Sequence, residues 1–192
     1  MTMEYIIIIV SAIFVNNIVL TQFLGICPFI GVSNRLSTSV GMGGAVIFVM
    51  TLATTVTYLI QKYILAPFDL VFLQTIAFIL VIAALVQVVE IVLKKVSPAL
   101  YQALGVFLPL ITTNCTILGV ALLVHTKELN LLESVVFAIG NSAGFTLALV
   151  VMAGIREQLE LVDIPAGMKG VPASLLLAGL LSLAFMGFTG II

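Results

Sequence analysis

CPFIGV, at residues 27–32, returns as CTILGV at residues 115–120. Both segments begin with a cysteine, and these two cysteines are the only ones in the chain of 192 residues. Their offset, 115 minus 27, is 88 residues and therefore close to half the chain. A duplicated unit that carries a thiol to equivalent places in both halves predicts that the two sulfurs act together, rather than filling unrelated positions in a core.

The composition defines the solvent in which the chain folds. Hydrophobic residues make up 62% of the chain, charged residues only 8%, and the mean hydropathy is +1.37. These charges are too few to cover a water-soluble globule of this size, so we predict an all-α integral membrane protein with one membrane domain over residues 1–192. The lipid bilayer then surrounds the protein and is one of its expected partners. A net charge of -1 provides no basic field, which excludes nucleic acid as a partner.

Six apolar stretches, each near the roughly 20 residues that cross a bilayer core, predict six transmembrane helices. They run approximately over residues 5–32, 40–59, 70–93, 99–124, 132–155 and 172–191.

The basic residues of the expected loops divide unevenly between the two sides of the membrane. If the N-terminus lies outside, the inner loops carry Arg35, Lys94, Lys95, Arg156 and Lys169. The outer loops then carry Lys62 and Lys127. An excess of basic residues marks the cytoplasmic side, so we predict a multi-pass protein with both termini outside.

An odd number of spans in each half requires the second half to enter the membrane in the opposite orientation. We therefore predict a 3+3 inverted repeat, with residues 1–96 as the first repeat and 97–192 as the second. Straight helices would keep the thiols apart, because Cys27 would lie about 33 Å along the first span and Cys115 about 24 Å along the fourth, entered from the other side. Pro28 and the polar run 112–114 disfavour helix beside the cysteines, so we expect the first and fourth helices to be interrupted there.

The residues alone leave several roles open for the two thiols. A lone membrane cysteine is usually a small buried apolar residue, and a disulfide has little reason to form on the reducing side of a membrane. Zinc or an iron-sulfur cluster needs about four ligands, and the single histidine, His125, lies in an expected outer loop. In that case Cys27 and Cys115 supply half of a metal site, and a second chain supplies the other half.

Four segments carry a resemblance to a known family. They are Phe23–Phe29 (FLGICPF), Phe107–Cys115 (FLPLITTNC), Gly154–Glu157 (GIRE) and Ala184–Phe188 (AFMGF). With them the chain resembles, essentially from end to end, the A-type subunits of the Rnf ion-translocating electron-transfer complexes. The E-type subunit of the sodium-pumping NADH:quinone reductase is a related protein, but the CPF sequence and the Asn16–Asn17 pair look more similar to Rnf.

The resemblance implies a six-helix protein that pairs with a homologous membrane subunit of opposite orientation, the E-type Rnf subunit. The two subunits would hold a two-iron two-sulfur (2Fe-2S) cluster inside the membrane, with two cysteines from each. In this chain the ligands would be Cys27 and Cys115, with the backbone of Gly25 and Asn114 beside the cluster.

The resemblance also implies an activity for the whole complex, which passes electrons between reduced ferredoxin and NAD and moves sodium ions or protons. The chain would be a non-autonomous subunit of this redox-driven ion translocase, in the cytoplasmic (inner) membrane of a bacterium or archaeon. Its sequence has no Rossmann, P-loop or flavin motif, so NAD, flavin and the other iron-sulfur centres would lie on other Rnf subunits.

Charged side chains are missing from the centre of every expected span, so a carboxylate proton relay is not expected in this chain. We expect a cation to be met instead by backbone carbonyls and hydroxyls of the broken segments, with Thr112, Thr113 and Asn114 as the candidate ion path. The alternative class is a small inverted-repeat secondary transporter or channel subunit without a redox centre. Visible absorption and a paramagnetic signal on reduction distinguish the two classes.

Uncharged polar and small residues also fall inside the expected spans. The amides are those of Asn16, Asn17, Gln22 and Asn141. We expect them to bond neighbouring helices or broken backbone, with guidance of an ion as the alternative. Gly140 and Gly144 have a spacing that predicts a close helix contact, either with the partner or within this chain.

Overall fold

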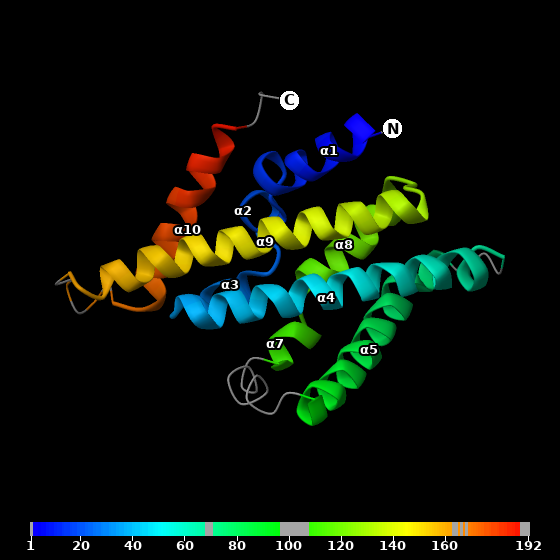
Figure 1. Ribbon diagram of the computed structural model, residues 1–192, viewed down its shortest axis with the longest axis horizontal. Helices are drawn as coiled ribbons and strands as arrows, with labels where there is room; N and C mark the ends of the chain where they lie inside the picture. The colour runs from blue at the N-terminus through cyan, green and yellow to red at the C-terminus, as the bar shows by residue number, and fades with distance from the viewer. Residues whose placement is uncertain are drawn as a thin grey trace.

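The computed structural model describes residues 2–67, 71–96, 108–162, 165, 167 and 169–188. Every regular element in these ranges is a helix (Figure 1). In chain order they are α1 (Thr2–Val10), the π-helix η1 (Ser11–Val15), α2 (Ile18–Gln22), α3 (Ile26–Val32), α4 (Leu36–Ile60), the π-helix η2 (Gln61–Leu65), the short 3-10 helix η3 (Val71–Leu73), α5 (Gln74–Val96), α7 (Leu108–Thr112), α8 (Cys115–Thr126), α9 (Leu131–Leu159) and α10 (Val171–Met186).

The helical segments overlap the apolar stretches expected from the sequence. Four are long and apolar enough to cross a membrane, namely Leu36–Leu65, Gln74–Val92, Pro109–Thr126 and Leu131–Leu159. Two shorter apolar helices are Tyr5–Val15 and Val171–Met186. The prediction of a helical membrane protein is therefore confirmed. Residues 99–107, the start of the fourth expected span, lie outside the described residues.

The long helices α4 and α9 form the centre of the fold, where they lie side by side and run in opposite directions (Figure 1). Helix α8 packs against both of them, α5 packs against α4, and α1 and η1 lie along α9. The fully buried side chains at this centre are those of Met42, Val46, Met50, Ile117, Val120, Leu149 and Met152. This tight apolar core holds the broken segments described below.

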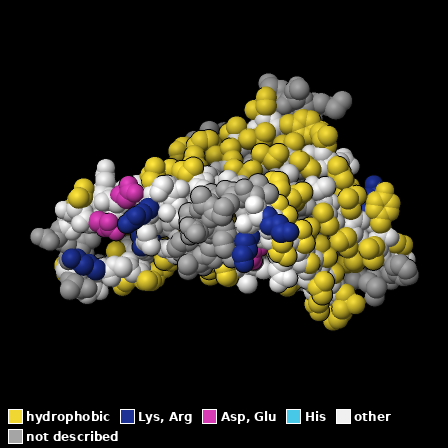
Figure 2. All heavy atoms as spheres, turned by 60° about the horizontal axis from the view of Figure 1, so that its bottom comes forward, with side chains coloured by type: hydrophobic (Ala, Val, Ile, Leu, Met, Phe, Trp, Pro, Cys, Tyr) yellow, Lys and Arg dark blue, Asp and Glu magenta, His cyan; other side chains and the backbone are white. Residues whose placement is uncertain are grey.

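Large apolar side chains also cover the outside of the protein. Phe48 and Leu80 are 57% and 67% exposed, which suits a protein whose solvent is lipid. Figure 2 shows hydrophobic side chains over the right-hand part of one face, with charged side chains at its left end, where α9 meets α10, and in a group near its middle. The surface therefore agrees with the sequence, in which apolar spans alternate with charged loops.

The two ends of the α4–α9 pair hold different loops. At one end, which we name the Arg156 end, the Glu157 carboxylate accepts from the backbone N–H of Leu36 at 3.0 Å. At the other, the Lys127 end, the side chains of Gln61 and His125 meet with 3.5 Å between Nε2 atoms. The expected inner loops around residues 35 and 156 thus share one end, and the expected outer loops around residues 62 and 127 share the other.

The first expected span is broken more often than the sequence indicates. The sequence predicts a break beside Cys27, and one lies at residues 23–25, between α2 and α3. A second break, at residues 16–17, separates the π-helix η1 from α2 and is not predicted by the sequence. The stretch 5–32 is therefore a chain of short helices, because several of its backbone groups bond to side chains rather than to a continuous helical ladder.

Candidate functional site at the two broken helices

The break before Cys27 depends on left-handed backbone. Helix α2 ends at Gln22 and is followed by Phe23, whose φ is +54°, and α3 follows Gly25, whose φ is +83°. Glycine adopts this conformation without the steric cost that a Cβ adds. The sequence predicted that Pro28 contributes to this break, and that prediction is wrong. Pro28 lies within the first turn of α3, where a missing N–H is tolerated. Cys27 stands in the same turn and is exposed.

The break before Cys115 depends on an asparagine cap. Helix α7 ends at Thr112, and α8 begins at Cys115. The Asn114 side chain accepts from the backbone N–H of Thr116 at 3.0 Å, which satisfies one of the unpaired donors at the start of α8. Cys115 is thus the first residue of α8, and its thiol is partly exposed.

The two breaks meet each other inside the fold. The backbone N–H of Gly25 donates to the sulfur of Cys115 at 2.9 Å. Packing here is tight, since a Cβ on Gly25 would collide with Thr116 Oγ1 and come within 2.9 Å of the Phe145 ring. Gly25 lies two residues before Cys27, so its Cα is at most about 7 Å from that of Cys27. The structure therefore brings both cysteine segments to one place.

The thiols would form only part of a metal site in this chain. Both cysteines are free, and among the described residues no group of three or more His, Cys, Asp and Glu side chains is placed to hold a metal ion. A 2Fe-2S cluster is held by about four thiolates. Two free cysteines on segments that meet, with Cys27 exposed at the surface, fit half of such a site with the remainder on another chain.

The three residues expected on the ion path have different surroundings. Thr112 is partly buried at the end of α7, and Thr113 is exposed, with its hydroxyl donating to Pro109 O at 3.0 Å. Asn114 is 4% exposed, and its Nδ2 is buried without a hydrogen-bond partner. The Thr116 hydroxyl is also buried without a partner. Asn114 and Thr116 thus face the protein interior, whereas Thr113 lies at the surface.

The break at residues 16–17 is a feature that sequence reasoning missed. The buried Asn17 side chain donates to Gly144 O at 2.8 Å and to Ile13 O at 3.2 Å, and accepts from Val19 N at 3.2 Å. The adjacent pair of amides in an apolar run was the available signal. The sequence predicted that these amides bond neighbouring helices or broken backbone, but it did not predict a break beside them. The predicted bonding is confirmed for Asn17.

The glycine pair of α9 makes its close contact within this chain. An added Cβ on Gly144 would lie 3.0 Å from Ala12 O and 3.2 Å from Ile13 Cα. On Gly140 it would lie 3.4 Å from Ile9 Cα. Of the two contacts considered from the sequence, the one within this chain is therefore found, and it seats the first broken span against α9.

Comparisons of the sequence with known proteins identify its family. The model of the Rnf-Nqr family, described as "Rnf-Nqr subunit, membrane protein", matches residues 5–192. The A-type subunit of the Na(+)-translocating ferredoxin:NAD(+) oxidoreductase complex of Acetobacterium woodii is 59% identical over 188 residues, covering 98% of each chain. The A-type subunit of the ion-translocating oxidoreductase complex is 53% identical in Aeromonas salmonicida, over 98% of each chain, and 55% identical in Syntrophotalea carbinolica, over 96% of each. The chain therefore belongs to the Rnf-Nqr family of membrane subunits.

Proposed function

We propose that the chain is the A-type membrane subunit of an ion-translocating ferredoxin:NAD oxidoreductase complex. The relative named for this role, from Acetobacterium woodii, is 59% identical over 98% of each chain, and the A subunit of the ion-translocating oxidoreductase complex of Aeromonas salmonicida is 53% identical over the same share. The single observation that carries the redox part is the meeting of the two cysteine segments, in which Gly25 N–H bonds the Cys115 sulfur. The protein is a non-autonomous part of the complex, and the ferredoxin, NAD and flavin sites lie on other subunits.

In this proposal, Cys27 and Cys115 supply two of the four ligands of a 2Fe-2S cluster. The other two come from a homologous subunit of opposite orientation seated against the exposed face of Cys27. When bound, the cluster would accept and pass on one electron. The chain's own contribution is to hold both sulfurs at the beginnings of helices, with the positive end of the backbone dipole of α8 at Cys115.

The depth of Cys115 supports a position inside the membrane. It lies eleven residues before Thr126, or about 16 Å along α8 from the Lys127 end, which is near the middle of a core about 30 Å thick. Each half also has a helix that begins after a break at its cysteine segment, namely α3, which starts one residue before Cys27, and α8, which starts at Cys115. We infer from this pairing and from the 88-residue repeat that the halves form a 3+3 inverted repeat.

Iron analysis of the chain purified with its membrane partner tests the proposal. We expect Cys27→Ser and Cys115→Ser each to remove about two irons and one paramagnetic signal of the reduced state, because serine is a poor replacement for a thiolate. Thr113→Ser, beside the same break, is the matched control and should keep both. Full iron and an unchanged signal in either cysteine variant would contradict the assignment and favour a transporter subunit without a redox centre.

The positive-inside pattern further supports the Arg156 end as the cytoplasmic side of the inner membrane, with both termini outside. Ion movement coupled to electron transfer is part of the proposal, and Thr112, Thr113 and Asn114 are its sequence-based candidate path. The buried, unpartnered Nδ2 of Asn114 favours a role for this residue inside the site, next to the Cys115 sulfur, over one in an open channel.

A further inference from the structure

A second polar region lies apart from the cysteines, in a cavity of about 270 Å³ between the first broken span, the end of α8 and the start of α9. Its polar lining residues are Ser11, Asn16, Gln22, Lys127 and Asn141. The other lining residues are apolar. Polar groups of this kind are costly inside a membrane unless they bond to protein or line a cavity that a ligand or water occupies.

The cavity extends from the Lys127 end to the middle of the fold. Lys127 lies just past the end of α8, whereas Asn141 lies ten residues along α9 from its first residue, Leu131. Ten residues of helix are about 15 Å, or half of a hydrocarbon core about 30 Å thick. Because Lys127 and Asn141 line the same cavity, it connects one surface with mid-membrane depth.

The deep part of the cavity lies against broken backbone. Ser11 begins the π-helix η1, and Asn16 ends it with its N–H donating to Ser11 O at 2.7 Å. The Asn16 side chain also donates to Ser11 Oγ at 3.3 Å. Helix ends leave carbonyl groups outside the helical ladder, and in membrane proteins such groups at cavities coordinate cations.

The amide groups in the cavity present oxygen rather than nitrogen. Asn141 is 2% exposed, and its Nδ2 donates to Phe137 O at 2.8 Å. Asn16 likewise uses Nδ2 on Ser11. Neither Oδ1 accepts a hydrogen bond from the described residues, so each is available to a ligand. Both residues thus offer an uncharged acceptor at the inner end of the cavity.

The chemistry of the lining points to one class of ligand. None of the described residues that line the cavity is Asp, Glu or His, the side chains that usually form proton relays in membrane proteins. Uncharged oxygens also neutralise a divalent cation poorly, because such sites normally use carboxylates. Amide, hydroxyl and carbonyl oxygens without counter-charge suit a weakly held monovalent metal cation.

We propose that this cavity is a vestibule for a monovalent metal cation such as Na⁺, which reaches Ser11, Asn16 and Asn141 from the Lys127 end. The inference rests on the proposed function in taking a translocated ion as the occupant. At the mouth, the Lys127 ammonium lies 4.9 Å from the centroid of the Phe137 ring. This fixed positive charge weakens cation binding, so the vestibule is a low-affinity site that fills and empties readily.

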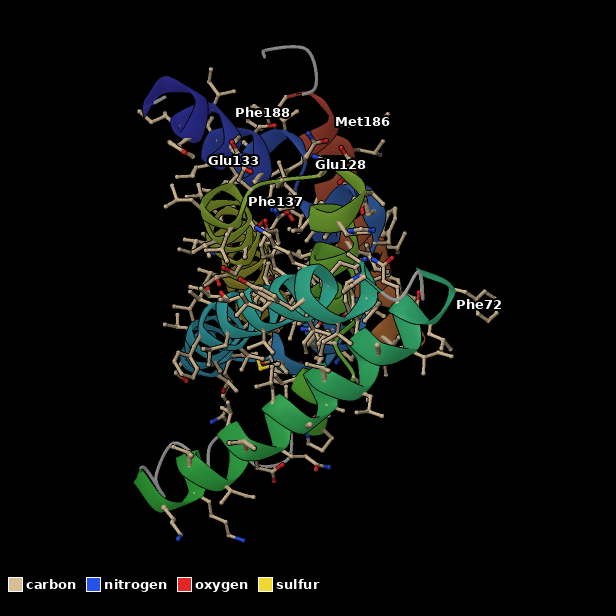
Figure 3. The ribbon with its side chains drawn as sticks, turned by 90° about the vertical axis from the view of Figure 1, so that its right-hand side faces the viewer. Phe72, Glu128, Glu133, Phe137, Met186 and Phe188 are labelled. Carbon is tan, nitrogen blue, oxygen red and sulfur yellow. The ribbon has the colours of Figure 1, made fainter. Side chains whose placement is uncertain are left out.

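The surroundings of the mouth are visible from the Lys127 end. Figure 3 shows Glu133 and Phe137 on α9 beside α1, with Glu128 close by at the end of α8. Glu133 lies one turn nearer the surface than Phe137, and its carboxylate accepts from the N–H of Asn130 at 3.0 Å. The carboxylates attract cations to this end, and Lys127 opposes their retention.

A thiol placed in the cavity tests the vestibule directly. In oriented vesicles that carry the complex, Ser11→Cys should react with a membrane-impermeant cationic thiol reagent from the Lys127 side. The parent protein measures the background from Cys27 and Cys115. Na⁺ should slow the reaction, whereas choline at equal ionic strength should not. A lipid-facing control, Ile79→Cys, should stay unreactive; Ile79 is 50% exposed on α5.

Substitutions at two lining residues should then change the affinity for Na⁺ in opposite directions. In the Ser11→Cys background, Asn141→Leu should raise the half-protecting Na⁺ concentration about tenfold, because it removes an oxygen ligand. Lys127→Gln, at an exposed position that folding tolerates, should lower it severalfold. The matched amide control is Asn34→Leu, since Asn34 is exposed at the Arg156 end.

The vestibule would be overturned if Ser11→Cys were not labelled from the Lys127 side. It would also be overturned if Na⁺ failed to slow the labelling both in Ser11→Cys and in Ser11→Cys combined with Lys127→Gln. The assay needs no electron transfer and no iron. Iron content and the paramagnetic signal, measured in the same vesicles, test the proposed function separately. Failure of the redox assignment is therefore distinguishable from failure of the vestibule.

Discussion

The amide nitrogen of Gly25 lies 2.9 Å from the sulfur of Cys115, and its N–H donates to that sulfur. The two residues are 90 positions apart and belong to different halves of the chain. A sulfur that accepts an N–H carries negative charge more readily. The backbone of the first broken helix, at Gly25, therefore influences the charge on the sulfur of Cys115 in the second broken helix.

Replacing Gly25 should change the electronic properties of the site. In Gly25→Ala, the new Cβ would meet Thr116 Oγ1 and the Phe145 ring, and φ of +83° disfavours alanine, so the segment would shift away from Cys115. Loss of a hydrogen bond of about 1 kcal/mol corresponds to about 40 mV for a one-electron couple. The N–H donor of Gly25 stabilises the more negative, reduced form of the proposed 2Fe-2S cluster. Its loss should therefore lower the midpoint potential of that cluster.

A redox titration followed by electron paramagnetic resonance measures this shift. Gly44→Ala is the control, because a Cβ on Gly44 meets nothing within 4 Å. An unchanged potential in Gly25→Ala would show that the N–H to sulfur contact has no influence on the site.

The same substitution at two glycines of α9 should have opposite effects on stability. Gly144→Ala places a Cβ 3.0 Å from Ala12 O, a backbone atom that cannot move aside, and should cost about 1–3 kcal/mol. Gly154→Ala meets only Leu36 Cδ1 at 4.0 Å and should gain about 0.5–1 kcal/mol through reduced backbone entropy of the unfolded state. Thermal unfolding followed by circular dichroism compares them, and equal midpoints would refute the close η1–α9 contact.

The buried amide of Asn17 should stabilise the break at residues 16–17. Asn17→Leu leaves Gly144 O, Ile13 O and Val19 N without their side-chain partner, which should lower the free energy of unfolding by about 3 kcal/mol. Asn34→Leu is the control, since exposed Asn34 makes a single side-chain contact of 3.5 Å. Protease resistance of the first forty or so residues in detergent provides the measurement. Similar resistance in the two variants would contradict this role.

Arg156 should hold the end of α3, the helix that contains Cys27. Its Nη1 donates to Ile30 O at 2.7 Å and to Ser33 Oγ at 2.9 Å, and so anchors the end of α3 to α9. Arg156→Lys replaces a planar fork by a point charge and should lower the unfolding free energy by about 1–2 kcal/mol. Glu157→Gln, which keeps an acceptor for Leu36 N, should be close to neutral. Equal unfolding midpoints for Arg156→Lys and the parent protein would argue against the anchor.

The candidate site was partly predictable because its signals are local. The paired cysteines stand out through the repeat at 27–32 and 115–120, and the polar residues beside Cys115 mark a break by their chemistry. The break at residues 16–17 escaped prediction, since whether Asn17 bonds its own helix or a neighbouring one depends on where Gly144 O lies. A contact between residues 127 positions apart leaves no periodic pattern in the sequence.

By itself the sequence determined that this is an all-helical membrane protein built around two related cysteine segments. Composition indicates a membrane protein, and continuous apolar runs of about 20 residues indicate helices, because barrel strands are about half as long and alternate apolar with polar residues. Tertiary structure alone decided that Gly25 meets the Cys115 sulfur and that Asn16 and Asn141 share a cavity with Lys127. These relations depend on the packing of helices distant in sequence, where the absence of a Cβ on Gly140 and Gly144 lets the broken span come close enough to α9 to fix its place.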